Sequence, residues 1–98
     1  MPAFVFRFGY EAPWEKESNE RYGTDFESSQ WVVIDAKDEA DALSWGCEIA
    51  EQYVRRVCGE SWRAGEFAFW VESPTECPWA VGRPSVVVGQ LPDFVDWT

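Results

Sequence analysis

The sequence predicts an α+β fold, a two-layer sandwich in which one crossover helix covers a four-stranded sheet, in the order β-β-α-β-β. Residues 3–10 and 65–73 alternate aromatic side chains with other residues, which is the period-two pattern of a strand. Residues 38–59 repeat apolar residues every three or four positions, as an amphipathic helix does. Because 46% of its 98 residues are hydrophobic, the chain 1–98 is expected to form a single domain with its own core.

The N-terminal third is expected to contain two strands joined by a long loop. AFVFRFGY, residues 3–10, alternates Phe and Tyr with smaller or charged side chains. Residues 11–24 contain Pro13, Gly23 and a run of charges that fits neither periodicity, which predicts a loop. QWVVIDA, residues 30–36, is apolar at both parities and is therefore typical of a central strand.

Residues 38–59 carry signals for both ends of a helix. Asp38 is suited to cap the first turn, where Glu39 and Asp41 favour the positive end of the helix dipole. Gly59 follows the last turn, at a position that glycine favours. The residues that recur at intervals of three and four are expected to face the sheet, and they are Ala40, Leu43, Cys47, Ala50, Val54 and Val57.

Two further strands are predicted after the helix. The third, residues 65–73, ends at Pro74, and the fourth is a short strand at residues 85–90. Residues 74–84 contain three Pro and one Gly, so they are expected to form a structured loop. If the second and third strands share one sheet, the helix crosses over one face of it. The 74–84 loop then lies near the helix N-terminus, and the 11–24 loop lies at the far end.

The predicted fold has more apolar surface than one helix and one sheet can bury. Trp45, Ile49 and Tyr53 form a second apolar flank on the helix, beside the stripe expected to face the sheet. Trp31 and Trp70 point away from the helix-facing side of the predicted sheet. These five residues are therefore the candidate interface residues.

Three alternatives would bury this excess apolar surface. Apolar residues of the loops and of the C-terminal tail are able to fold back on the body, through Trp14, Trp79, Phe94 and Trp97. A second copy of the chain would bury the open sheet face as a homodimer. A different protein partner, or a ligand, is the third cover, since exposed aromatic patches mark interaction sites.

The net charge of −10 limits the classes of partner. With 18 acidic residues, 8 basic residues and no His, the chain is not expected to bind nucleic acid or an anionic membrane. The acidity either keeps an apolar-rich chain soluble or attracts a basic protein partner. No apolar run reaches the ~18 residues of a membrane span and no signal-peptide pattern is present, so a cytoplasmic location is expected.

The residue types argue against catalysis and against a metal site. The absence of His removes the commonest general base, and the sequence contains no GxSxG, P-loop, dinucleotide-binding or HExxH motif. Cys47, Cys58 and Cys77 lie at long spacings that fit neither a disulfide framework nor a zinc site, so reduced thiols are expected. Neither a metal nor a cofactor is predicted. Glu76 is expected to raise the pKa of Cys77, which disfavours a nucleophilic role.

Two sets of charged residues have specific expected roles. Glu11, Glu15 and Glu17 flank Trp14 in the 11–24 segment, a combination also found where sugars stack beside catalytic acids. Arg83 in the 74–84 loop is expected near the helix N-terminus, where it would pair with its acidic residues, Asp38, Glu39 and Asp41.

The strand that runs into AKDEADAL, residues 36–43, resembles the strand-to-helix junction of many small bacterial α+β proteins, including HicB-like antitoxin domains. The resemblance is confined to this junction and assigns no family. The sequence therefore predicts a small acidic, non-catalytic domain for protein interaction or self-association, with an immunity-like or antitoxin-like role as one form. The alternative is a small enzyme or ligand-binding protein that uses the Trp and Glu residues of the 11–24 segment.

Overall fold

The computed structural model describes residues 2–80 and 83–97, and it shows an α+β fold built on a four-stranded mixed sheet with strand order β3-β1-β2-β4. The helices and strands are β1 (Ala3–Tyr10), α1 (Pro13–Tyr22), β2 (Ser28–Asp35), α2 (Glu39–Tyr53), β3 (Phe69–Glu72) and β4 (Val86–Val87). β1 is antiparallel to both β2 and β3, whereas β2 and β4 are parallel. The order is β-α-β-α-β-β, with two helices where the sequence predicted one.

β1 lies between β2 and β3, so its alternation determines both faces of the sheet. Phe6 and Phe8 are buried on the face that α2 covers. Val5 and Arg7 point to the opposite face, because successive side chains of a strand alternate. The β1–β2 register pairs Phe6 with Val32, which keeps the helix-facing side apolar across both strands.

α2 packs closely against β1 at Gly46. Gly46 is buried, and a Cβ atom placed on it would overlap the ring of Phe6. Glycine is therefore what lets the helix backbone reach the aromatic ring. Ile49 and Tyr53, one and two turns further along the helix, are buried on the same side.

The stripe that the sequence predicted to face the sheet is wrong in part. Ala40 and Val57 are exposed, while Ile49 and Tyr53 belong to the core and offer no free surface for a partner. The prediction followed the apolar spacing alone and gave no weight to Gly46. The close approach at Gly46 orients the helix so that Ile49 and Tyr53 face the sheet, while Trp45 lies against the C-terminal segment.

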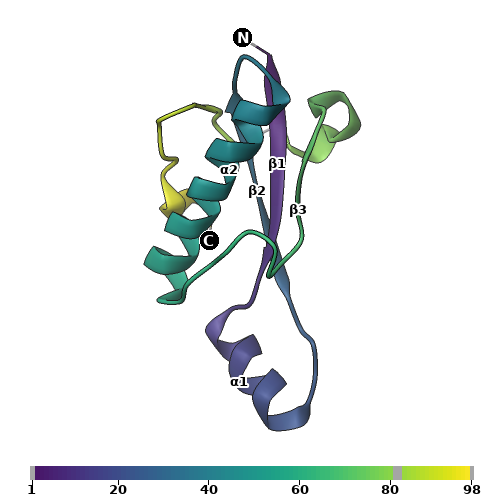
Figure 1. Cartoon of the computed structure of the whole chain (residues 1–98), viewed down its shortest axis with the longest axis vertical. Helices are drawn as coiled ribbons and strands as arrows, with labels where there is room; N and C mark the ends of the chain where they lie inside the picture. The colour runs from purple at the N-terminus through teal and green to yellow at the C-terminus, as the bar shows by residue number, and fades with distance from the viewer. Residues whose placement is uncertain (1, 81–82, 98) are drawn as a thin grey trace.

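The C-terminal segment covers the flank of α2 that carries Trp45 and Tyr53 (Figure 1). The indole N–H of Trp45 donates to the backbone oxygen of Gln90 at 2.9 Å. The rings of Phe94 and Trp97 lie 5.5 and 5.1 Å from the ring of Tyr53. For this side of the molecule, the chain itself supplies the cover.

Residues 11–24, predicted as a loop, form α1 instead. Pro13 starts the helix, and Glu15 Oε1 accepts a hydrogen bond from the backbone N–H of Ala12 at 2.8 Å. Gly23, with φ of 67°, ends it. α1 projects beyond the sheet at the end opposite the turns of residues 74–80, as the predicted topology required, and the molecule measures 45 × 24 × 24 Å (Figure 1).

The predicted ends of the main helix are confirmed. Asp38 accepts a hydrogen bond from the backbone N–H of Asp41 at 2.9 Å. A π-helical turn, Val54–Cys58, continues α2 as far as Gly59, whose φ is 70°. In the described part of the chain, no helix has the length and hydropathy of a bilayer span.

The last two strands are shorter than predicted. β3 begins only at Phe69, because Ala64 and Phe67 form an isolated bridge in the turn that precedes it. β4 contains two residues, because the backbone N–H of Val87 binds the side chain of Gln90 in a tight turn, at 3.2 Å.

Gly46→Ala is expected to lower the free energy of unfolding by about 1–2 kcal/mol. The added Cβ would overlap the Phe6 ring, so the overpacking cost is expected at about 2–3 kcal/mol, the upper part of its usual range, and the helix propensity of Ala returns about 1 kcal/mol. Ser44→Ala on the exposed side of α2 is the matched control and should be neutral or slightly stabilising. Urea denaturation measures both variants. A Gly46→Ala protein as stable as the control would contradict the close contact.

Candidate functional site

The sheet face opposite α2 carries indole and guanidinium side chains in contact with one another. We call this surface the tryptophan–arginine face. It consists of Arg7 from β1, Trp31 from β2, Trp70 from β3, and Trp79 and Arg83 from the segment between β3 and β4.

The rings and the guanidinium groups of this face form one chain of contacts, from Trp70 to Arg83. The guanidinium carbon of Arg7 lies 5.0 Å from the ring centroid of Trp70 and 4.8 Å from that of Trp79. Trp79 meets Trp31 edge to face, with centroids 5.3 Å apart and an interplanar angle of 85°. Arg83 lies 4.2 Å from the ring of Trp31. Each such cation–π contact contributes about 0.5–1 kcal/mol at an exposed site.

Arg83 contacts Trp31 and not the acidic residues that the sequence predicted as its partners. Its Nη1 donates to the backbone oxygen of Trp31 at 2.6 Å, and burial lowers the pKa of its guanidinium. The predicted pairing with Asp38, Glu39 and Asp41 is wrong, since no ion pair of Arg83 is found among residues 2–80 and 83–97. The stacking partner lies about fifty residues away in the sequence, so no local pattern indicates it.

Glu72 connects the ring stack to a buried thiol. It lies 3.9 Å from Arg7 and accepts a hydrogen bond from the Cys77 thiol at 3.0 Å. That hydrogen bond, together with Trp70 and the charge of Arg7, lowers the pKa of Glu72. The same hydrogen bond, followed by burial, raises the pKa of Cys77 to about 11. Cys77 is therefore a protonated, weakly nucleophilic thiol at neutral pH.

Part of this face is open to solvent. The side chains of Trp70 and Trp79 are 37% and 46% exposed, while Trp31 is half-buried beneath Arg83. A hollow of about 250 Å³ adjoins the stack and is lined by apolar residues that include Val5 and Val33. The surface thus combines fixed aromatic rings with a shallow apolar depression.

The five residues predicted from the sequence are divided between this face and the core. Trp31 and Trp70 both lie on the tryptophan–arginine face, one on each side of Arg7 in the sheet, whereas Ile49 and Tyr53 are internal. Trp45 is half-buried, with its indole N–H bound to the tail.

The sequence analysis missed Arg7 as a member of this surface and placed Trp79 only among the covering residues. Arg7 stands at the parity opposite to Phe6 and Phe8 on β1, and this alternation is a signal that assigns it to the same face as Trp70. Trp79 belongs to an irregular segment, so no periodicity points to it.

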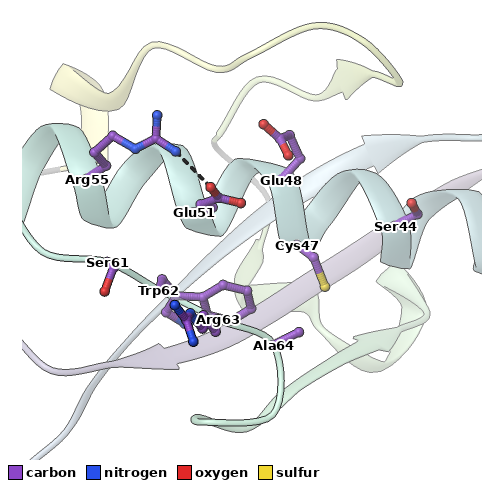
Figure 2. Close-up of a pocket in the computed structure, with 9 residues that line it drawn as sticks. All are labelled: Ser44, Cys47, Glu48, Glu51, Arg55, Ser61, Trp62, Arg63 and Ala64. Carbon is purple, nitrogen blue, oxygen red and sulfur yellow. Dashed lines mark hydrogen bonds and ion pairs between the residues drawn. The ribbon is translucent and has the colours of Figure 1, made fainter.

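A second depression, of about 560 Å³, lies between the exposed side of α2 and residues 61–64 (Figure 2). Glu51 of α2 and Arg55 of the π-helical turn lie one turn apart along this side and form a 2.7 Å ion pair (Figure 2). Cys47 directs its sulfur toward the loop that carries Trp62 and Ala64 (Figure 2). Burial raises the pKa of the Cys47 thiol, so this groove holds no thiolate nucleophile at neutral pH.

The carboxylates beside Trp14 have structural partners. Glu15 is 2% exposed and accepts hydrogen bonds from the Ala12 backbone and from the Ser28 hydroxyl, both at 2.8 Å. Glu11 accepts a hydrogen bond from the Asn19 side chain, also at 2.8 Å. These bonds attach α1 to the body of the molecule. Within the described residues there is no cluster of three or more acidic, Cys or His side chains placed to hold a metal ion.

Comparisons of this chain with protein-family models, with curated proteins and with solved structures found no match.

Glu72→Gln is expected to shift the alkylation of Cys77 to lower pH, because the Glu72 carboxylate is the main cause of the raised pKa of that thiol. Iodoacetamide labelling between about pH 7 and about pH 10, followed by peptide mass spectrometry, measures the rate at each cysteine separately. Cys47 serves as the internal control, since its pKa is raised by burial and not by Glu72. An unchanged profile for Cys77 in the variant would show that the Glu72 contact does not control the thiol.

Proposed function

We propose that this chain is a non-catalytic protein-interaction domain that binds its partner through the tryptophan–arginine face. The supporting observation is the pair of half-exposed indoles, Trp70 and Trp79, held on either side of the Arg7 guanidinium. Tryptophan and arginine are the residues most enriched among those that dominate binding energy at protein interfaces.

The geometry also favours binding by reducing its entropic cost. Arg7 lies between two rings and Arg83 is anchored to the backbone of Trp31, so these long side chains are largely ordered before any partner arrives. Association otherwise costs about 0.5–1.5 kcal/mol for each flexible side chain that becomes immobilised. A preorganised surface of this kind keeps more of its contact energy as affinity.

The charge of the chain favours a basic partner. A net charge of −10 produces a long-range attraction toward a positively charged protein, and the indoles then provide the short-range contacts. The guanidinium groups of the face are stacked on rings, and Arg7 also lies beside Glu72, so the face itself adds little repulsion. Masking of a basic protein, as in an immunity or antitoxin role, is one concrete form of this function.

Trp79→Ala is expected to weaken partner binding at least about tenfold, because truncation of a central aromatic residue at an interface commonly costs more than 1.4 kcal/mol. The matched control is Trp14→Ala, since Trp14 is 64% exposed on α1, far from the tryptophan–arginine face. The partner is captured from extracts of the source cell by the wild-type chain and identified by mass spectrometry. Calorimetry with the purified partner then compares the affinities of the three proteins.

Equal losses in Trp79→Ala and Trp14→Ala would show that exposed indoles bind non-specifically. A loss confined to Trp14→Ala would place the contact on α1 and remove the tryptophan–arginine face as the site.

The rate of association with the partner is expected to fall as salt rises from about 50 mM to about 500 mM, because screening shortens the range of the attraction. The rate of dissociation should change little, since the stacked indole contacts are short-range. Stopped-flow mixing measures both rates. An association rate that does not depend on salt would contradict attraction to a basic partner.

A further inference from the structure

One edge of the sheet leaves backbone groups unpaired. β3 is the terminal strand on its side and pairs only with β1. The hydrogen bond from the Gly9 N–H to the Ala68 oxygen, at 2.8 Å, identifies this pair as hydrogen-bonded. Hydrogen-bonded pairs alternate along an antiparallel ladder, so Trp70 and Glu72 also direct their backbone groups toward β1.

The backbone N–H and C=O groups of Phe69 and Val71 consequently point away from the sheet. No hydrogen bond to these four groups is found within the described ranges. The opposite edge is formed by β4 and by the part of β2 that precedes it, because β4 pairs only with Ile34 and Asp35. Side chains interrupt this edge, since Arg83 donates to the backbone oxygen of Trp31 and Gln90 binds the N–H of Val87. An unpaired edge of this kind is a template for another strand.

We propose that a second copy of this chain pairs with β3 in antiparallel fashion, with the two-fold axis passing through Trp70. Phe69 then lies opposite Val71 of the second copy, and the two strands form four backbone hydrogen bonds. This inference goes beyond the proposed function, because it concerns the sheet edge and does not depend on what the tryptophan–arginine face binds.

The hydrogen bonds already present select this register among the symmetric ones. A pairing centred on Phe69 would place Val71 opposite Phe67, which already forms a bridge with Ala64. A pairing centred on Val71 would place Phe69 opposite Ser73, whose backbone oxygen already accepts from Glu76 at 3.0 Å. A pairing centred on Trp70 uses groups of Phe69 and Val71 alone.

The side chains agree with this register. Glu72 lies opposite Ala68 of the second copy, so no two carboxylates meet directly across the new ladder. The two Trp70 residues form a non-hydrogen-bonded pair, the type in which side chains lie closest. Both indoles project on the same side, so the two tryptophan–arginine faces join into one surface across the axis.

Charge distinguishes this dimer from the complex with a basic partner. Two chains of net charge −10 repel each other at long range, and salt screens that repulsion. Self-association is therefore expected to strengthen as salt rises, whereas binding to the basic partner weakens. The two interactions respond in opposite directions to the same variable.

Val71→Pro tests the edge and Val71→Ala is its matched control. Proline removes an N–H that points away from β1, so the intramolecular ladder stays intact while two of the four new hydrogen bonds, one for each copy, are lost. Alanine removes the same side chain and keeps the N–H. Sedimentation velocity is expected to show dimers for the wild type and Val71→Ala and monomers for Val71→Pro. Circular dichroism checks that each variant folds.

Trp70→Cys tests the axis independently of proline tolerance. Cβ atoms of a directly opposed pair lie about 4.5–5.5 Å apart, close to the spacing of a disulfide. Oxidised glutathione accepts the two electrons and two protons that the introduced thiols lose. A covalent dimer is expected for Trp70→Cys but not for the wild type or Val71→Cys, because position 71 lies opposite Phe69 and not opposite itself.

Two results would overturn the proposal. One is a wild-type chain that stays monomeric at every concentration and salt level. The other is cross-linking of Val71→Cys as fast as that of Trp70→Cys, which would exclude an axis at Trp70. If Val71→Pro does not fold, the cross-linking comparison alone decides. A monomeric wild type that still binds its partner through Trp79 would remove the dimer and leave the proposed function standing.

Discussion

The contact between Gly46 and the Phe6 ring determines how the aromatic residues of this chain are divided. Because the helix backbone reaches the ring at this point, α2 is rotated so that Ile49 and Tyr53 enter the core. Tyr53 then forms the base on which Trp97 and the rest of the C-terminal segment pack. The helix and the tail together cover one side of the sheet, and neither of them covers the opposite side.

Tryptophan is accommodated differently on the two sides of the sheet. On the helix side, Trp62 is buried against Phe8 and donates its indole N–H to the Gly9 oxygen at 2.9 Å. On the other side, Trp70 and Trp79 remain partly exposed and are stacked with Arg7, while Arg83 lies against both Trp31 of this side and the buried Trp97 of the helix side. Guanidinium suits this role better than ammonium, because it is planar and more weakly hydrated. Stacking is expected to keep these rings ordered without removing them from solvent.

Sequence reasoning predicted the parts of this fold that local patterns determine. The alternation of β1 and the cap at Asp38 follow from neighbours in the sequence, and both were confirmed. α1 was missed because no apolar periodicity supports it, although Glu15 at the third helical position is itself a capping signal. The orientation of α2 and the stacking of Arg83 depend on residues distant in the sequence. Part of the candidate site was nevertheless predicted from the sequence. Successive side chains of a strand alternate between the two faces of a sheet, and this alternation alone places an indole on the face opposite the helix.

The position of β1 at the centre of the sheet explains why the exposed rings and the unpaired edge lie together. β1 is paired on both sides by β2 and β3, so the free backbone groups belong to its two neighbours, and one of them, β3, also carries Trp70. Natural proteins protect such edges with charge, proline or short length. This chain places Pro74 shortly after the strand and limits β3 to four residues, which prevents open-ended polymerisation along a long edge. A short edge bounded in this way still admits one partner strand, and a two-fold pairing uses up the edge that it occupies, because each copy contributes its β3.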